Sequence, residues 1–188
     1  MCHHKEGFMD ALECIKGRRS VREFKDTPVT HEVLESIIDS ARFAPSWKNT
    51  QISRYVALTG DSKKALADTS FEAWAGNAKI VNGAPVVIVQ TYIKNRSGFE
   101  RDGSFSTSKE DRWQNYDCGI AAEAFCLAAY EKGLGTVIMG IFDEDKVAKV
   151  LNLSDDQGVA AIIALGYPVS ESAAPKRKEV SELLTYLS

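Results

Sequence analysis

A run of four apolar residues, Val-Val-Ile-Val at positions 86–89, places the strongest constraint on how this chain can fold. Gly83-Ala84-Pro85 precedes the run and ends any helix that leads into it. β-branched side chains favour the extended conformation, and successive side chains of a strand point to opposite faces. Because this strand is apolar on both faces, both must be covered. The sequence therefore predicts a strand with other elements packed above and below it.

Elsewhere the apolar residues alternate between the helical and the strand pattern. Helical spacing predicts helices over residues 8–17, 30–43, 62–81 (in two pieces), 111–131, 143–151 and 180–187. Thr30 and Asp143 are the expected N-caps of two of these helices. Apolar runs predict further strands at residues 54–59, 136–141 and 159–165. On pattern alone this alternation favours a doubly wound parallel sheet, although it does not fix strand direction. The phosphate fingerprints of that class, G-x-G-x-x-G after a strand and G-x-x-x-x-G-K-[ST], are missing.

The composition is that of an ordinary globular domain. With 188 residues, 44% of them hydrophobic, we expect one domain over residues 1–188, with residues 1–8 as a loose N-terminus. Lys and Arg number 23 against 26 Asp and Glu, and the net charge of −3 argues against a nucleic-acid binder. The longest nearly unbroken apolar stretch, residues 158–165, is too short to cross a membrane, and the N-terminus lacks the apolar core of a signal peptide. We therefore expect a cytoplasmic protein with no nucleic-acid or membrane partner.

The four cysteines do not form a metal-binding pattern. Cys118 and Cys126 fall inside a helical pattern, where a small buried thiol is the usual explanation. Nothing in the sequence suggests a base that would activate Cys14. Cys2-His3-His4 places three donors side by side, and such adjacent donors cannot close a tetrahedral site. We expect neither a metal site nor a cysteine nucleophile.

Cationic residues gather at two places that are far apart in the sequence. Arg-Arg-Ser-x-Arg occupies positions 18–22, directly after the first predicted helix, and Lys176-Arg177-Lys178 lies in the tail. Lys79 stands near the end of another predicted helix. A phosphomonoester carries nearly two negative charges, and guanidinium groups grip its oxygens in pairs. The two clusters either converge on one phosphate or form separate solvated runs, and charge spacing alone does not decide between these readings.

Three loops carry further signals. Residues 44–51 (Ala-Pro-Ser-Trp-Lys-Asn-Thr-Gln) hold side-chain amides that can read the edge of a planar heterocycle, although ordinary turn chemistry also explains them. Residues 94–110 are polar and aperiodic, which is typical of a lid, a binding loop or a disordered segment. Gly133-Leu134-Gly135 precedes a strand, where a helix C-cap and a turn explain both glycines.

Four motifs in order resemble those of the FMN-dependent nitroreductase family. They are Arg-Arg-Ser-x-Arg-x-Phe at 18–24, Ala-Pro-Ser-x-x-Asn-x-Gln at 44–51, Gly-Leu-Gly-Thr at 133–136 and Gly-Tyr-Pro at 166–168. The resemblance covers residues 10–187. It implies an α+β fold, a three-layer α/β/α sandwich around a mostly antiparallel sheet, built as an intertwined homodimer with FMN at the interface. That implication overrides the parallel sheet that the pattern favours.

The resemblance also implies which residues hold the flavin. The FMN phosphate would be held by Arg18, Ser20, Lys176, Arg177 and Lys178. The phosphate, ribityl and pyrimidine edge would be lined by Arg19 and Arg22. The partner chain would contribute Pro45, Ser46, Asn49 and Gln51. One face of the ring would be covered by Ile138, Met139 and Gly140, with Lys79 near the ring. Since the flavin carries the hydride, no side chain is assigned a catalytic role.

The activity that the resemblance implies is ping-pong transfer from NADH or NADPH, through FMN, to nitroaromatics, quinones or enones. Two alternatives stay open: a related flavoenzyme that dehalogenates or oxidises a ring, and a protein that holds flavin without significant turnover. An interaction domain without cofactor is a third reading of the basic clusters. The family often continues Asn-x-Gln with Pro-Trp, where this chain has Ile52-Ser53. At 188 residues the chain is also near the short end of the family, so the loop 94–110, with Phe99 and Phe105, would serve as a lid in place of the extra helices that wall the substrate channel in larger members.

Overall fold

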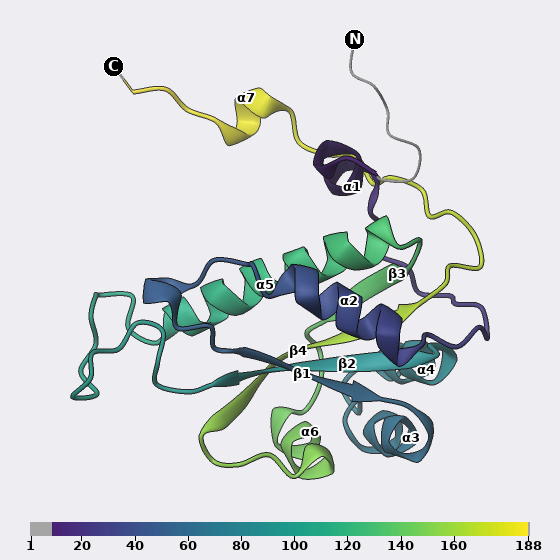
Figure 1. The fold of residues 1–188 in the computed structure, drawn as a ribbon, viewed down its shortest axis with the longest axis horizontal. Coiled ribbons are helices and arrows are strands. Elements are labelled where there is room, and N and C mark those ends of the chain that lie inside the picture. The colour runs from purple at the N-terminus through teal and green to yellow at the C-terminus, as the bar shows by residue number, and fades with distance from the viewer. Residues whose placement is uncertain (1–8, 188) are drawn as a thin grey trace.

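The computed structural model describes residues 9–187, so Cys2-His3-His4 lies outside the described part. Four strands form one sheet, in the order β1-β2-β4-β3 (Figure 1). The strands are β1 (Ser53–Leu58), β2 (Val86–Ile93), β3 (Gly135–Met139) and β4 (Gln157–Gly166). The central position of β2 follows from its apolar sequence, since a central strand is covered on both faces and paired on both edges.

Every neighbouring pair of strands is antiparallel. The parallel sheet that the pattern favours is therefore wrong, and the antiparallel sheet implied by the resemblance is confirmed. Two helices, α3 (Gly60–Thr69) and α4 (Ala75–Gly83), connect β1 to β2. A parallel pair needs one crossover helix, whereas a helix pair returns the chain to the end at which β1 finished. Hydrophobic periodicity locates both helices but carries no information about that return.

Helices cover both faces of the sheet in a three-layer α/β/α arrangement (Figure 1). One layer holds α3, α4 and α6 (Glu144–Leu151), and the other holds α2 (His31–Ala41) and α5 (Arg112–Glu131). Val87 and Val89 pack in the core on the α3 side, while Val86 and Ile88 pack in the core on the α5 side. The prediction that this strand is covered on both faces is confirmed.

Helix starts follow the predicted caps. The Oγ1 atom of Thr30 accepts a hydrogen bond from the Val33 N–H at 3.4 Å, at the start of α2. The Oδ1 atom of Asp143 accepts one from the Lys146 N–H at 3.1 Å, at the start of α6. Three short helices complete the described part: α1 (Ala11–Gly17), the 3₁₀ turn η1 (Trp47–Asn49) and α7 (Val180–Leu183).

The segment between β2 and α5 contains neither a helix nor a strand, in agreement with its aperiodic sequence. It folds back on itself as an irregular hairpin, with Phe99 and Phe105 paired across it and their ring centroids 4.9 Å apart. The N–H of Ser106 donates to the carbonyl of Gly98 at 2.8 Å, which closes the same hairpin.

Gly133 and Gly135 are needed for different reasons. Gly133 has φ +75°, the left-handed conformation that a helix C-cap predicts. Gly135 is not in that region; a Cβ atom there would lie only 2.5 Å from Cγ2 of Val21. Gly135 therefore allows the segment after α1 to approach β3, and the turn chemistry predicted for it from the sequence is wrong.

We expect Gly135→Ala to lower the free energy of unfolding by about 1–3 kcal/mol, because the added methyl group overpacks the contact with Val21. Gly83→Ala is a matched control, since a Cβ atom at Gly83 meets nothing within 4 Å. Urea denaturation measures both variants against the parent protein. Equal stability of all three would contradict this role of Gly135.

Candidate functional site

The basic segment after α1 is fixed to the outer edge of β3. The N–H of Val21 donates to the carbonyl of Thr136 at 2.9 Å, and the N–H of Lys25 donates to the carbonyl of Tyr167 at 2.8 Å. Residues 20–25 thus lie beside β3 and beside the chain that leaves β4. This pairing brings the start of the chain next to the start of its tail.

The structure brings the two basic clusters together around one hollow of about 420 Å³, called here the arginine hollow. Its lining comes from the segment after α1 and from the tail: Arg18, Arg19, Ser20, Arg22, Ser172, Ala173, Pro175 and Arg177. Lys176 and Lys178 are exposed and do not line it. Of the two readings that the charge pattern allows, convergence is the one that the geometry favours.

The guanidinium groups of the arginine hollow are held mainly by main-chain carbonyls. Arg19 Nη1 donates to the carbonyls of Lys16 and Arg18 at 2.7 and 2.8 Å, and Arg22 Nη1 donates to that of Ser20 at 3.3 Å. Arg18 has an ionic partner, with its Nε 3.5 Å from Oε1 of Glu123. A single half-exposed carboxylate leaves most of the positive charge uncompensated, so the hollow suits an anion that carries more than one charge.

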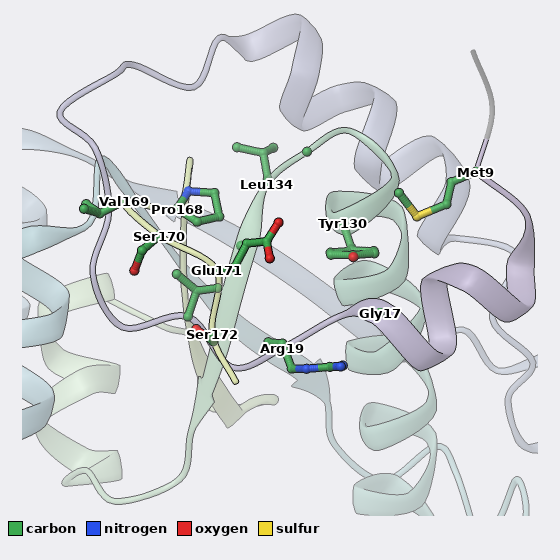
Figure 2. Close-up of a pocket in the computed structure, with 13 residues that line it drawn as sticks. Met9, Gly17, Arg19, Tyr130, Leu134, Pro168, Val169, Ser170, Glu171 and Ser172 are labelled. Carbon is green, nitrogen blue, oxygen red and sulfur yellow. The ribbon is translucent and has the colours of Figure 1, made fainter. Parts of the chain in front are cut away.

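A larger cavity of about 580 Å³ adjoins the arginine hollow and shares Arg19 and Ser172 with it. Figure 2 shows this cavity between the end of α1, the turn from α5 to β3, and the chain after β4. Tyr130 and Leu134 supply apolar surface, whereas Glu171 places a carboxylate among the lining residues. The arginine hollow is thus cationic, and the cavity that adjoins it is lined by both apolar and polar side chains.

Residues 45–51 lie away from the arginine hollow in the structure. Pro45, Ser46 and Gln51 line a separate hollow of about 580 Å³, called here the edge hollow, together with residues of α2, β1 and α5. Asn49 is exposed and does not line it. The side chain of Ser46 accepts a hydrogen bond from the Gln51 N–H at 2.9 Å, so part of the predicted turn chemistry is present.

The arginine hollow and the edge hollow lie at opposite edges of the sheet. Residues 20–25 lie beyond β3, and residues 45–51 lead into β1, with β4 and β2 between them. Neighbouring strands are about 4.8 Å apart, so the two edge strands are separated by roughly 14 Å. The two hollows share no lining residue. One chain by itself does not bring the two predicted sets of residues together.

At the end of β3 the main chain is accessible to a ligand. Met139 is 4% exposed and packs in the core on the α3 side, so its side chain is not free to cover a ligand. Ile138 is 46% exposed, and a Cβ atom at Gly140 would meet nothing within 4 Å. A flat ligand can therefore approach the main chain at Gly140. Lys79 is exposed on α4 and lines neither hollow.

Two buried polar residues that support these segments were missed in the sequence. Asn77 in α4 donates from Nδ2 to the carbonyl of Ile141 at 3.0 Å, which fixes the chain just after Gly140. Asp117 in α5 accepts hydrogen bonds from the Trp47 N–H at 3.1 and 3.0 Å, which fixes the start of η1. A polar residue in the buried stripe of a predicted helix was the available signal for each.

Residues 9–187 contain no cluster of three or more His, Cys, Asp or Glu side chains that could hold a metal ion. The described helices include none long and apolar enough to span a membrane. Burial raises the pKa of the Cys118 thiol to about 11 and also raises the pKa of Cys126. Both thiols are therefore protonated near neutral pH, where only the thiolate is nucleophilic.

We expect Cys118 and Cys126 to resist alkylation by iodoacetamide at pH 8 in the folded protein. With a pKa of about 11, the thiolate fraction of Cys118 at pH 8 is on the order of one in a thousand, and burial also denies access to the reagent. Mass spectrometry of tryptic peptides gives the modified fraction. The same sample in urea is the control, and equal labelling in both states would contradict the buried, protonated state.

An antiparallel sheet between two helical layers, with an arginine-lined hollow at one edge, defines an α+β protein whose cationic edge suits an anionic ligand. The sequence model of the family described as "Nitroreductase family" matches residues 15–167 of this chain. The chloronitrobenzene nitroreductase of Comamonas testosteroni is 26% identical over 96% of this chain and 97% of its own. The oxygen-insensitive NADPH nitroreductase of Helicobacter acinonychis is 27% identical over 93% of this chain and 95% of its own.

Solved structures agree with this match. A nitroreductase family protein from Clostridium novyi NT is 31% identical, with a TM-score of 0.72 over 85% of this chain and 86% of that one. A protein from Desulfovibrio desulfuricans, solved in complex with FMN, is 26% identical, with a TM-score of 0.75 over 94% and 96%. The chain belongs to the nitroreductase family, a family of oxidoreductases.

Proposed function

We propose that the protein is an FMN-dependent NAD(P)H oxidoreductase that reduces electron-poor acceptors in two-electron, ping-pong turnovers. The observation that carries this proposal is the arginine hollow, where Arg18, Arg19, Ser20 and Arg22 meet Arg177 of the tail. FMN offers a phosphate of matching charge, and the FMN-bound relative has the same fold. When bound, the flavin accepts a hydride from the nicotinamide and passes the electrons on to the acceptor.

The residues of the arginine hollow fit the phosphate end of this cofactor. Guanidinium groups donate paired hydrogen bonds to phosphate oxygens, and the Ser20 hydroxyl adds a further donor. In the proposed site Arg18, Ser20 and Arg177 hold the phosphate, with Arg19 and Arg22 along the ribityl chain. Lys176 and Lys178 add positive charge from just outside the hollow. In this proposed site the flavin is held by noncovalent contacts, without a covalent bond to the protein.

The open main chain at Gly140 fits the ring end. Gly140 leaves room for the ring to lie against the backbone, and Ile138 offers exposed apolar surface beside it. We place Ile138, Met139 and Gly140 along one face of the ring, with Met139 contributing its main chain. A cation near the pyrimidine edge, either Arg22 or Lys79, would stabilise negative charge that develops on reduction.

We further propose that two copies of the chain form an intertwined homodimer with a shared site. Apolar side chains are exposed on α1 and on the tail: Leu12, Ile15, Val180, Leu183 and Leu187. Figure 1 shows α7 and the tail extending away from the sheet on the side of α1. Exposed apolar surface of this kind marks a protein interface. A partner chain would also supply Pro45, Ser46, Asn49 and Gln51, which one chain keeps at the opposite edge of its sheet.

We expect Arg18→Ala combined with Arg177→Ala to weaken FMN binding by at least about 100-fold, because two charge-assisted contacts of about 1.5–3 kcal/mol each are lost. Riboflavin lacks the phosphate, so its affinity should stay within about threefold of the parent value. Quenching of flavin fluorescence measures both constants. Lys149→Ala, which removes an exposed cation from α6, is the matched control. Unchanged FMN affinity in the double variant would contradict the assigned phosphate site.

Rapid mixing of the FMN-loaded protein with NADH or NADPH tests the activity itself. We expect loss of the flavin absorbance within the turnover time, followed by reoxidation with a nitroaromatic, a quinone or an enone. Reduction without reoxidation by these acceptors would favour dehalogenation or ring oxidation. A bound flavin that neither nucleotide reduces would indicate a flavin-holding protein. The preferred nucleotide is read from the same traces, and a cytoplasmic location stays a prediction that cell fractionation tests.

A further inference from the structure

Asp117 carries a buried carboxylate for which the described residues supply no ion pair. It is 3% exposed in the first half of α5. Taking an ionised carboxylate out of water is costly, so its hydrogen bonds must compensate. Its two oxygens accept from the Trp47 N–H at 3.1 and 3.0 Å, and Oδ2 also accepts from the Ser97 hydroxyl at 2.5 Å. All three donor contacts come from outside α5.

The segment that Asp117 holds has an unusual backbone. Lys48, Asn49 and Gln51 have φ values of 43°, 56° and 48°, in the left-handed region that non-glycine residues rarely adopt. Such residues persist only where surrounding contacts over-determine them. The Asp117 carboxylate supplies that support at the start of the segment, and the Ser46 hydroxyl supplies it at the end by accepting from the Gln51 N–H.

The loop 94–110 belongs to the same network. Ser97 is fully buried, and its hydroxyl also pairs with the Thr50 hydroxyl at 2.7 Å. Nearer the tip of the loop, the ammonium group of Lys48 lies 2.9 Å from Oε1 of Glu100. The start of the loop therefore supports residues 46–51 from one side, and α5 supports them from the other.

We propose that Asp117 is a positioning residue for the flavin, because its carboxylate, together with Ser97, holds residues 46–51 in the conformation that presents Ser46, Asn49 and Gln51 to the ring. This inference rests on the proposed function, in which those three residues contact the flavin of the partner chain. Asp117 itself acts through the Trp47 main chain. Without it, the left-handed turn relaxes and the three side chains lose their common orientation.

The test compares Asp117→Ala with Gln114→Ala in the full-length protein. Gln114 lies one turn earlier in α5, is also buried, and accepts from the Asn95 N–H at 2.7 Å. It therefore anchors the same loop, and its hydrogen bonds go to Asn95 and Asp111 rather than to residues 46–51. Hydrogen exchange of the flavin-free protein, read by mass spectrometry, reports the order of the peptide that contains residues 46–51. Fluorescence quenching gives the affinities for FMN and for riboflavin.

We expect faster exchange at residues 46–51 in Asp117→Ala and a loss of about tenfold or more in affinity, since hydrogen bonds to a charged group are removed. The loss should be equal for FMN and riboflavin, because both carry the same ring. Gln114→Ala should change the exchange at residues 46–51 and the flavin affinities much less than Asp117→Ala does, because it leaves the Asp117 contacts in place. If Asp117→Ala does not fold, Ser97→Ala removes one donor of the same carboxylate and should act in the same direction.

Different results overturn different claims. Faster exchange with unchanged flavin affinity would overturn the positioning role and leave the proposed function intact. A loss confined to FMN, or an equal loss in Gln114→Ala, would also overturn it, since the effect would then arise at the phosphate or from general loosening of α5. A parent protein that binds neither flavin would overturn the proposed function, and the positioning role would fall with it.

Discussion

The burial of β2 on both faces is the constraint on which the rest of the structure depends. Because Val86, Val87, Ile88 and Val89 fill both cores, helices must cover the sheet above and below, and its middle is closed to ligands. Polar chemistry is left to the two edges of the sheet and to the ends of its strands. The arginine hollow lies beyond β3, and the edge hollow lies beside β1. A site that needs both sets of residues therefore needs a second chain, which the proposed dimer would provide.

Much of this fold could be predicted from local sequence. Helix and strand positions followed from apolar period, and the caps at Thr30 and Asp143 followed from side-chain chemistry. Strand direction could not be predicted, because it depends on how α3 and α4 fold against each other rather than on where they begin. The reason for Gly135 was also hidden, since the contacting atom belongs to Val21, which is distant in sequence. The family resemblance, in contrast to the local pattern, does imply the antiparallel sheet.

In the candidate site, too, some residues could be predicted from the sequence and others could not. The motifs located the cationic residues, and the structure added that Arg177, rather than its two lysine neighbours, lines the hollow. Met139 could not be distinguished from Ile138 by motif, although alternation along β3 sends its side chain into the core. Asn77 and Asp117 act through main-chain groups of other segments, and no motif records such a contact. Residues that position a site are harder to find than residues that bind.

The arginine hollow joins Arg18, just after the first helix, to Arg177, which lies beyond β4 and beyond the part of the chain that matches the family description. The sheet and both helical layers can be complete before this contact exists. During synthesis the arginine hollow is therefore completed only after Arg177 has emerged, later than every strand of the sheet. A protease that clips the exposed tail before Arg177 would take away part of the site while leaving the hydrophobic cores whole. If FMN binds in the proposed site, flavin retention would report whether Arg177 is present rather than whether the cores are folded.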